Sequence, residues 1–376
     1  MQYFNPVNIV SSPGARGQLA LNCVSKVVLI VCTQSAFERF SNDEKLSPLF
    51  SLPNCRFEHN FSSNPAMEDI VKISKKYAGT GLNLILGLGG GSAMDVAKIA
   101  SASIPAAKNG ITLSELLANS SLFDTFGAID CIQVPTTAGT GSEVTPFATV
   151  WDYDSQQKKS LSHPKMFAKA CYIDSDFLID IPLNIALSTG LDALNQAFES
   201  IWNKNASDVS LLYAMKAAEL SLNALPRLSE LSESPNLRQE LMTASVFAGV
   251  AISQTRTAIC HSISYPLTLR FNLPHGLACA FSMLEVLDFN SALISKKISR
   301  ISAALSGVEV EEIIKSVFEK YNVSKIIQSY IPNEDSVLNI MDEMHTTGRF
   351  ENNIKNCSEK DLENIIQKSC KRIFEN

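Results

Sequence analysis

The feature that most constrains the fold is an apolar segment that runs into glycines and then into a helix. Residues 82–91 read LNLILGLGGG and residues 92–103 read SAMDVAKIASAS. The first segment has the continuous apolar character of a strand buried on both faces of a parallel sheet. Five small residues lie at the junction: Gly87, Gly89, Gly90, Gly91 and Ser92. Glycines let a backbone approach a phosphate, and the helix N-terminus adds N–H groups and a positive dipole end. A tight strand–helix turn is the alternative, but three consecutive glycines favour a pyrophosphate-binding loop.

Short apolar strands alternate with helical stretches through the first half of the chain. Strands are predicted at 26–32, 55–61, 82–91 and 130–137, and helices at 65–79 and 92–103. Such alternation indicates a parallel sheet with helices on both faces. Residues 147–173 are expected to form a hairpin with a polar turn.

Helical periodicity dominates the second half, from residue 181 onward. The change in character predicts a domain boundary near residue 180. We therefore expect an α/β dinucleotide-binding domain over 1–180 and an all-α domain over 181–376.

Composition and charge exclude several classes of protein. The chain has 376 residues, 45% of them hydrophobic and 19% charged, and a net charge of −6. These values are typical of a globular protein and give no basic surface for a nucleic-acid partner. No apolar run is long enough to span a membrane, and residues 1–14 do not read as a signal peptide. Nine scattered cysteines without a CxxC pair predict free thiols in a reducing cytoplasm.

A second polar, glycine-containing loop follows the strand predicted at 130–137. It reads PTTAGTGSEVT over residues 135–145 and offers hydroxyl groups at Thr136, Thr137, Thr140 and Ser142. An ordinary surface loop is the alternative. Two such loops at neighbouring strand ends fit a nucleotide-binding crevice better.

The second half contains a possible metal site. Asp192 and Gln196 lie four residues apart in GLDALNQAFES, and His261 and His275 lie within 15 residues of each other. One carboxylate and two imidazoles resemble the ligand sets of Fe(II) and also suit zinc. From spacing alone, histidines that are merely satisfied in a core are an equally good interpretation.

These motifs, in this order, resemble the iron-containing (group III) alcohol dehydrogenases over essentially the whole chain. The resemblance rests on GGGSAMDVAK (89–98), PTTAGTGSEVT (135–145), and GLDALNQAFES with CHSISYPLTLRFNLPHG. It implies a dehydroquinate synthase-like fold, Fe(II) or zinc, a nicotinamide cofactor and a homodimer. The activity implied is hydride transfer between the cofactor and a carbonyl carbon.

The resemblance also implies residue roles. Those matching cofactor-binding positions are Gly89, Gly90, Gly91, Ser92, Asp95, Thr136, Thr137, Thr140, Ser142 and Lys159, with Thr33 after the first strand and Lys98 as a basic follower of the glycine loop. Asp192, His261 and His275 match three of four metal ligands.

Two positions depart from the family pattern. Gln196 stands where the family has a histidine ligand, and Tyr265 stands where it has a second histidine one turn after His261. An amide oxygen is a weaker donor than imidazole, but a hard divalent ion accepts it. We expect Gln196 to be the fourth ligand. A tyrosine hydroxyl both donates and accepts, so Tyr265 is a candidate proton relay among the catalytic residues.

A narrower resemblance, to the branch of the family that reduces phosphonoacetaldehyde, rests on residues 145–164, residues 199–207 and the glutamine in the ligand helix. It implies a phosphonate substrate and a cationic partner for it. The candidates are Arg256, Arg270, Lys165 and His163.

The cofactor and the function each leave alternatives open. Thr33 and Gln34 follow the first strand without an acid there, which permits NADPH as well as NADH. A general short-chain alcohol dehydrogenase, another reaction on the same scaffold (dehydroquinate synthase or glycerol-1-phosphate dehydrogenase), and a non-catalytic nucleotide-binding relative with a lapsed metal site are the alternative functions.

Overall fold

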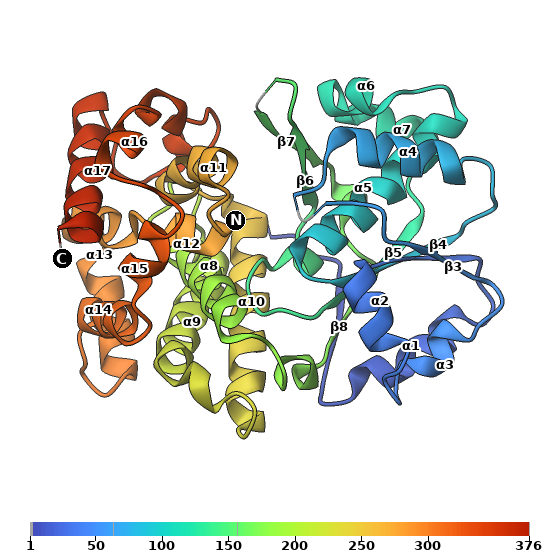
Figure 1. The fold of residues 1–376 in the computed structure, drawn as a ribbon, viewed down its shortest axis with the longest axis horizontal. Helices are drawn as coiled ribbons and strands as arrows, with labels where there is room; N and C mark the ends of the chain where they lie inside the picture. The colour runs from blue at the N-terminus through green and yellow to red at the C-terminus, as the bar shows by residue number, and fades with distance from the viewer. Residues whose placement is uncertain (1–2, 63, 156, 376) are drawn as a thin grey trace. The chain divides into compact units, whose positions relative to one another are not determined.

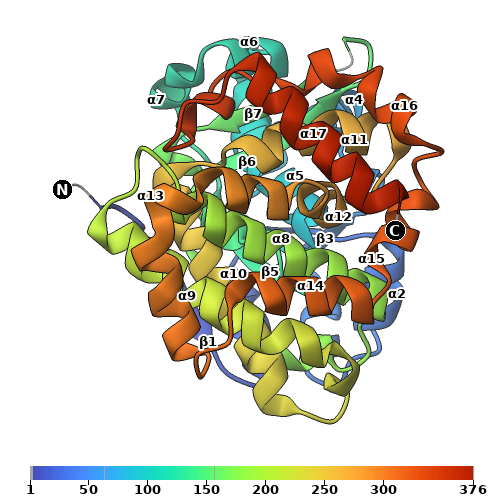
Figure 2. The ribbon, with the colours of Figure 1, turned by 90° about the vertical axis from the view of Figure 1, so that its left-hand side faces the viewer.

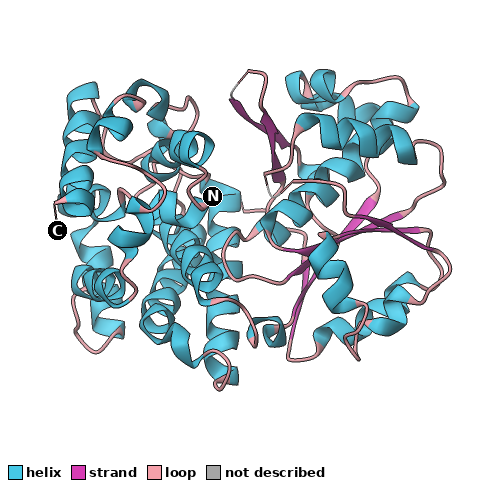
Figure 3. Ribbon diagram, in the orientation of Figure 1, coloured by secondary structure: helices cyan, strands magenta, loops and turns pink. Residues whose placement is uncertain are grey.

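The computed structural model describes residues 3–62, 64–155 and 157–375, which divide into two units. The α/β unit comprises residues Asn5–Thr137 and Ser142–Leu178. The helical unit comprises residues 179–375 together with 138–141 and the first described residues. Every described strand lies in the α/β unit, as Figure 3 shows in magenta.

The α/β unit is built on a six-stranded, all-parallel sheet with the order β1-β8-β5-β4-β2-β3. The strands are β1 (Asn8–Ser11), β2 (Val28–Val31), β3 (Cys55–Glu58), β4 (Leu84–Gly89), β5 (Asp130–Pro135) and β8 (Ala170–Ile173). Both faces of β2 and β4 are fully buried. This burial requires helices on both faces, because parallel sheets are covered on both sides.

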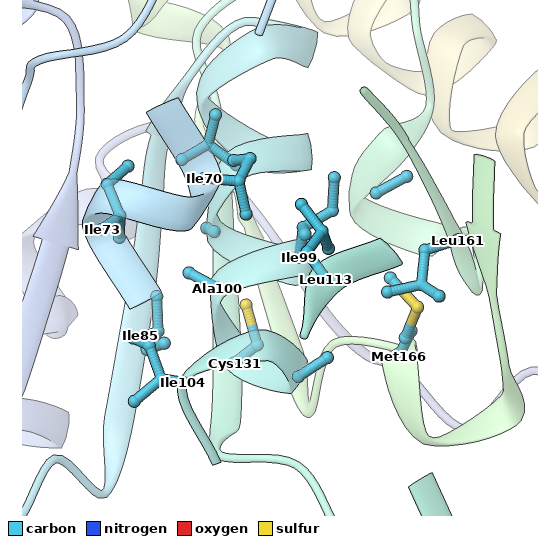
Figure 4. Close-up of a cluster of buried hydrophobic side chains, with 14 of the residues drawn as sticks. Ile70, Ile73, Ile85, Ile99, Ala100, Ile104, Leu113, Cys131, Leu161 and Met166 are labelled. Carbon is cyan, nitrogen blue, oxygen red and sulfur yellow. The ribbon is translucent and has the colours of Figure 1, made fainter. Parts of the chain in front are cut away.

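Figure 1 shows those two layers, with α1, α2 and α3 below the sheet and α4 to α7 above it. The helices are α1 (Leu19–Cys23), α2 (Gln34–Phe40), α3 (Ser47–Phe50), α4 (Met67–Tyr77), α5 (Gly91–Lys108), α6 (Leu113–Ala118) and α7 (Phe123–Phe126). The core under the upper layer combines strand and helix side chains such as Ile85, Ile70 and Ile99 (Figure 4). A β-strand alternates its faces, so Leu29 and Val31 reach this core while Val28 and Ile30 face the opposite layer.

The hairpin predicted over residues 147–173 is shorter than expected. Strands β6 (Phe147–Asp152) and β7 (Gln157–Ser162) pair antiparallel, and their turn includes residue 156, which lies outside the described residues. The prediction was wrong for its last part, because Ala170–Ile173 is buried throughout and joins the parallel sheet between β1 and β5. Strand β1 was not predicted, since it has four largely exposed residues at the sheet edge.

The helical unit contains several helices that pack around α8. Its helices are α8 (Leu183–Ile201), α9 (Asp208–Ala224), α10 (Pro235–Thr255), α11 (Ile259–Phe271), α12 (His275–Ala280), α13 (Met283–Ala304), α14 (Val310–Lys320), α15 (Val323–Gln328), α16 (Glu334–Leu338) and α17 (Glu359–Phe374). In Figure 2, α8, α9 and α10 lie side by side, and they pack on one another. The predicted combination of an α/β domain with an all-α domain is confirmed.

Among the described residues, the helices are all too short or too polar to cross a membrane.

Glu143 has a buried carboxyl group and lies in the short helix Ser142–Val144, which precedes β6. Burial raises its pKa to about 7, although a backbone hydrogen bond and the nearby Lys98 charge oppose the shift. The ordinary value is 4.5, so the folded chain holds this proton more tightly than the unfolded chain does.

The stability of the protein is therefore expected to fall as the pH rises from about 4.5 to about 7, and to level off above. Over this range the buried Glu143 carboxyl group lowers the free energy of unfolding by an amount on the order of 3 kcal/mol. Glu143→Gln should flatten this part of the profile, measured by denaturant unfolding between about pH 5 and about pH 8. An unchanged slope in Glu143→Gln would contradict this explanation.

Candidate metal centre and cofactor loops

Helix α8 is buried on nearly every face, yet it carries polar side chains. From Ala186 to Ile201 only Thr189 is not fully buried. The buried polar residues are Ser188, Asp192, Asn195, Gln196, Glu199 and Ser200. Buried carboxyl groups are costly unless they are paired, hydrogen-bonded or bound to a metal. The partners of the two acids on α8 therefore define the centre of this unit.

Glu199 is held entirely by α11. Its side chain is fully buried and accepts hydrogen bonds from the backbone N–H groups of Ala258 (2.7 Å) and His261 (3.2 Å). Its Oε2 lies 2.7 Å from Nδ1 of His261. A carboxylate on one ring nitrogen fixes the orientation of the imidazole and leaves the other nitrogen for a metal. Glu199 thus directs Nε2 of His261 toward Asp192.

Four potential ligand residues converge at that nitrogen. The donor atoms of Asp192, His261, His275 and Cys279 all lie within 4.8 Å of one another. Nε2 of His261 is 3.4 Å from Oδ1 of Asp192, and Nε2 of His275 is 3.9 Å from Sγ of Cys279. The predicted ligands Asp192, His261 and His275 are thus brought together, and Cys279 joins them.

The electrostatics of this cluster favour a cation. Burial alone would raise the pKa of Asp192, but its contact with His261 and the charge of His275 lower it. Burial alone would lower the pKa of His261, but the acidic groups around it, Cys279 first, raise it well above the ordinary value. The surroundings therefore stabilise positive charge at this point.

Two buried oxygens support a metal in the same place. Oε1 of Gln196 has no hydrogen-bond partner among the described residues, and Oδ1 of Asp192 has only its 3.4 Å contact with Nε2 of His261. Nε2 of Gln196 donates to the Thr140 carbonyl at 3.3 Å, so the amide nitrogen is engaged and the oxygen remains as a donor. Buried acceptors without donors are expected where an ion completes their coordination. The residues present fit a divalent metal.

Glycines allow the backbones around the centre to touch. A Cβ atom at Gly276, directly after His275, would lie 1.7 Å from the carbonyl oxygen of Ser188 on α8. A Cβ at Gly139 would lie 2.5 Å from the Thr189 side chain, and one at Gly141 would lie 2.4 Å from Cα of Gly249. Both loop glycines thus hold residues 138–141 against α8 and α10. Gly276 sets the distance between His275 and Asp192.

The ring of Tyr265 contacts the metal cluster, and Tyr265 in turn interacts with Arg256. The Tyr265 ring stacks on His275, with ring centroids 6.2 Å apart. Burial and the like charge of Arg349 lower the pKa of Arg256 to about 10, while Tyr265 raises it. Arg256 also has φ 64, an uncommon backbone conformation for a side chain other than glycine. Arg256 therefore interacts electrostatically with both Arg349 and Tyr265.

The other three candidates for a phosphonate partner contact side chains elsewhere in the protein. Arg270 makes a two-point ion pair with Glu343, at 3.1 and 2.8 Å. Lys165 pairs with Asp124 at 2.9 Å, and His163 stacks on Phe123 at 4.8 Å. Arg256 differs from these three because it interacts electrostatically with Tyr265, whose ring stacks on His275.

The α/β unit brings the glycine loop and the second loop together at neighbouring strand ends. Thr136 donates its N–H to the Gly89 carbonyl at 3.0 Å. A Cβ at Gly90 would lie 3.4 Å from the Thr137 hydroxyl. Gly90 also caps α5 without a side-chain hydrogen bond. This is the arrangement expected of a backbone surface that receives a phosphate.

The remaining predicted cofactor residues make contacts within the protein. Asp95 accepts from the Ser142 hydroxyl (2.5 Å) and from the Thr149 N–H (2.8 Å). Lys159 pairs with Asp152 at 2.6 Å across the β6–β7 hairpin. Thr33 caps α2 by accepting from the Ala36 N–H.

Lys98, the basic residue that follows the glycine loop on α5, is fully buried. Its ammonium group donates to the Ser142 carbonyl and to the Thr145 hydroxyl. Together with Asp95 it fixes the second loop against α5.

Family models match nearly the whole chain. Residues 6–175 match the iron-containing alcohol dehydrogenase model, and residues 186–370 match the model of the C-terminal part of the Fe-containing alcohol dehydrogenase family. The chain belongs to the iron-containing alcohol dehydrogenase family.

Curated relatives and solved structures agree with this membership. The chain is 34% identical over 232 residues to a phosphonoacetaldehyde reductase of Streptomyces viridochromogenes (60% of this chain, 58% of the relative). It is 32% identical over 223 residues to a 1-propanol dehydrogenase of Salmonella typhimurium (59% and 56%). These matches span less than two thirds of each relative. A sulfoacetaldehyde reductase of Bifidobacterium kashiwanohense, solved with NAD+, has the same fold with a TM-score of 0.81, 22% identity and 98% coverage of both chains.

Two residues at the centre were not predicted from the sequence. Glu199 lies seven residues after Asp192, two helical turns along the same face of α8, and Cys279 lies one turn after His275. That periodicity was a usable signal for both residues.

Gly276→Ala should separate α12 from α8, because its methyl group would overlap the Ser188 carbonyl. We expect a loss of about 1–3 kcal/mol or more in stability, and weaker metal binding. Thermal unfolding and a zinc competition titration measure the two effects. Gly17→Ala is the control, since its Cβ would meet only an ordinary contact, at 3.8 Å. Equal behaviour of the two variants would contradict the close-approach argument.

Glu199→Gln should keep the shape of the site but weaken the orientation of His261. Loss of such an outer carboxylate typically lowers metal affinity about 10- to 100-fold. The measurement is metal affinity by competition with a chromophoric chelator, with Glu343→Gln, on the exposed pair with Arg270, as the control. Unchanged affinity in Glu199→Gln would remove Glu199 from the centre.

Proposed function

We propose that this chain is a metal-dependent, NAD(P)H-linked reductase that converts a small aldehyde to its primary alcohol, and catalyses the reverse reaction. The observation that carries the proposal is the buried convergence of Asp192, His261 and His275, with Glu199 orienting one imidazole. Family membership supports the same reaction class. A complete and oriented ligand set argues against a lapsed site.

The metal is proposed to bind Asp192, Gln196, His261 and His275, and the cofactor to bind the loops at Gly89–Ser92 and Thr136–Thr137. When bound, the metal supplies a Lewis acid to the carbonyl oxygen, and the reduced nicotinamide supplies the hydride. Carboxylate, amide and imidazole donors suit iron(II) and zinc alike. Thr33 leaves room for NADPH beside NADH, because no acid follows β2 directly.

The protein's own groups hold the substrate and deliver the proton. Tyr265 is proposed to donate its hydroxyl proton to the developing alkoxide, since its ring lies on His275 and its hydroxyl is a competent donor. The burial of Asp192 and His261 keeps water away and strengthens the electrostatic interactions of the site. Overall, aldehyde, NAD(P)H and a proton give primary alcohol and NAD(P)+.

The substrate is proposed to carry an anionic group, with phosphonoacetaldehyde as the leading candidate and 2-hydroxyethylphosphonate as its product. Arg256 supports this, because it interacts electrostatically with Tyr265, whose ring stacks on His275. Guanidinium groups bind phosphonate-type oxygens through paired hydrogen bonds. The similarity to a phosphonoacetaldehyde reductase points the same way.

An uncharged short-chain aldehyde is the alternative substrate, favoured by the similarity to a 1-propanol dehydrogenase. A homodimer and a cytoplasmic location are part of the proposal, and the nine free cysteines agree with a reducing compartment.

Arg256→Met should separate the two substrates. It removes the charge but keeps most of the side-chain length. We expect KM for phosphonoacetaldehyde to rise about 10- to 100-fold, the equivalent of one charge-assisted hydrogen bond of about 1.5–3 kcal/mol. KM for propanal should stay the same. The measurement is steady-state NAD(P)H oxidation with both aldehydes.

Arg270→Met is the matched control, because Arg270 is paired with Glu343 on the surface. It should alter neither KM. A wild-type enzyme that prefers propanal would overturn the anionic substrate, and equal losses on both aldehydes would reduce Arg256 to a structural role.

A further inference from the structure

We infer that Cys279 supplies a thiolate ligand to the same metal, so that Asp192, His261, His275 and Cys279 are its strong ligands, the Gln196 amide oxygen is a weaker additional donor, and the site selects zinc over iron(II). This inference deepens the proposed function and rests on it for the presence of a metal. From the sequence, Cys279 was interpreted only as one of nine free thiols, and the residue is fully buried on α12.

The donor atoms of the cluster lie close to the spacing that is found around tetrahedral zinc. Donors around a tetrahedral zinc lie about 3.3–3.6 Å apart, given the usual Zn–N, Zn–O and Zn–S lengths. The separation between His261 Nε2 and Asp192 Oδ1 is 3.4 Å, and that between His275 Nε2 and Cys279 Sγ is 3.9 Å. All four donors lie within 4.8 Å of one another. Contraction by about an ångström would complete a tetrahedral set.

His275 and Cys279 lie on the same short helix, α12. Cys279 follows His275 by four residues, so the two side chains lie one above the other on α12. Gly276 fixes this short helix against α8 at Ser188. The same close approach that brings His275 to Asp192 therefore also brings the sulfur to the cluster.

Gln196 offers a metal only a weak donor. Its amide nitrogen is bound to the Thr140 carbonyl, so only one neutral oxygen is available from it. Neutral amide oxygens are weak donors compared with thiolate, and thiolate favours zinc among the divalent ions that two imidazoles and a carboxylate accept. Cys279 thus offsets the weak donor at 196, and the amide oxygen remains close by as an additional donor.

The experiment uses cobalt(II) as a spectroscopic substitute for zinc in the full-length protein. A thiolate ligand produces a sulfur-to-cobalt charge-transfer band in the near ultraviolet, which nitrogen and oxygen ligands do not. We expect this band in the wild-type protein and in Cys370→Ser, the control, whose buried cysteine lies on α17 outside the cluster. We expect its loss in Cys279→Ser.

Metal affinities complete the test. Cys279→Ser should lower zinc affinity by more than the about 10- to 100-fold typical of a lost outer hydrogen-bond partner. Iron(II) affinity should fall less, so the preference for zinc narrows. A wild-type cobalt spectrum without the sulfur band overturns the inference even where Cys279→Ser does not fold.

The cobalt spectrum and the aldehyde reduction assay test the thiolate ligand and the reductase activity independently of each other. A sulfur band in a protein that reduces no aldehyde supports the thiolate ligand and overturns the reductase. Aldehyde reduction without the band supports the reductase and overturns the thiolate ligand.

Discussion

The contact between Glu199 and His261 is the interaction on which the helical unit depends. It joins helices α8 and α11 through two residues that are 62 positions apart in the chain, and the Glu199 side chain is fully buried. Glu199 also binds the backbone at the start of α11. One carboxylate therefore anchors α11, fixes the tautomer of an imidazole and directs its second nitrogen toward Asp192. A buried charge in this position is tolerated because all of its partners are supplied by one neighbouring segment.

Close backbone approaches turn this contact into a site. Gly276 brings α12 onto α8, and Gly139 and Gly141 bring residues 138–141 onto α8 and α10. These positions leave no space for a side chain, so the separations between His275, Asp192 and Gln196 follow from backbone contact. Such contact defines distances more sharply than side-chain packing alone can, because close-packed backbones have little room to shift.

The fold was largely predictable from the sequence, and the centre only in part. The junction of β4, its glycines and α5 is local in the chain, so its pattern can be read directly, and the fold and family predictions are confirmed. The predicted hairpin wrongly included β8, because the partners of a strand in a parallel sheet are distant in sequence and cannot be identified from the local pattern. Glu199 and Cys279 were overlooked for the same reason, since their roles depend on contacts between helices. The roles assigned to Gln196, Tyr265 and the cofactor residues remain predictions.

The metal dependence of aldehyde reduction shows whether the cluster of Asp192, His261 and His275 is a working metal centre. Protein stripped by a chelator would be titrated with zinc or iron(II), and bound metal and NAD(P)H-linked reduction of phosphonoacetaldehyde would be followed together. We expect activity to be lost on stripping and to return in proportion to bound metal, with saturation at a single tight site per chain that His275→Ala abolishes. Full activity in the stripped protein, or tight metal binding that survives His275→Ala unchanged, would contradict this expectation.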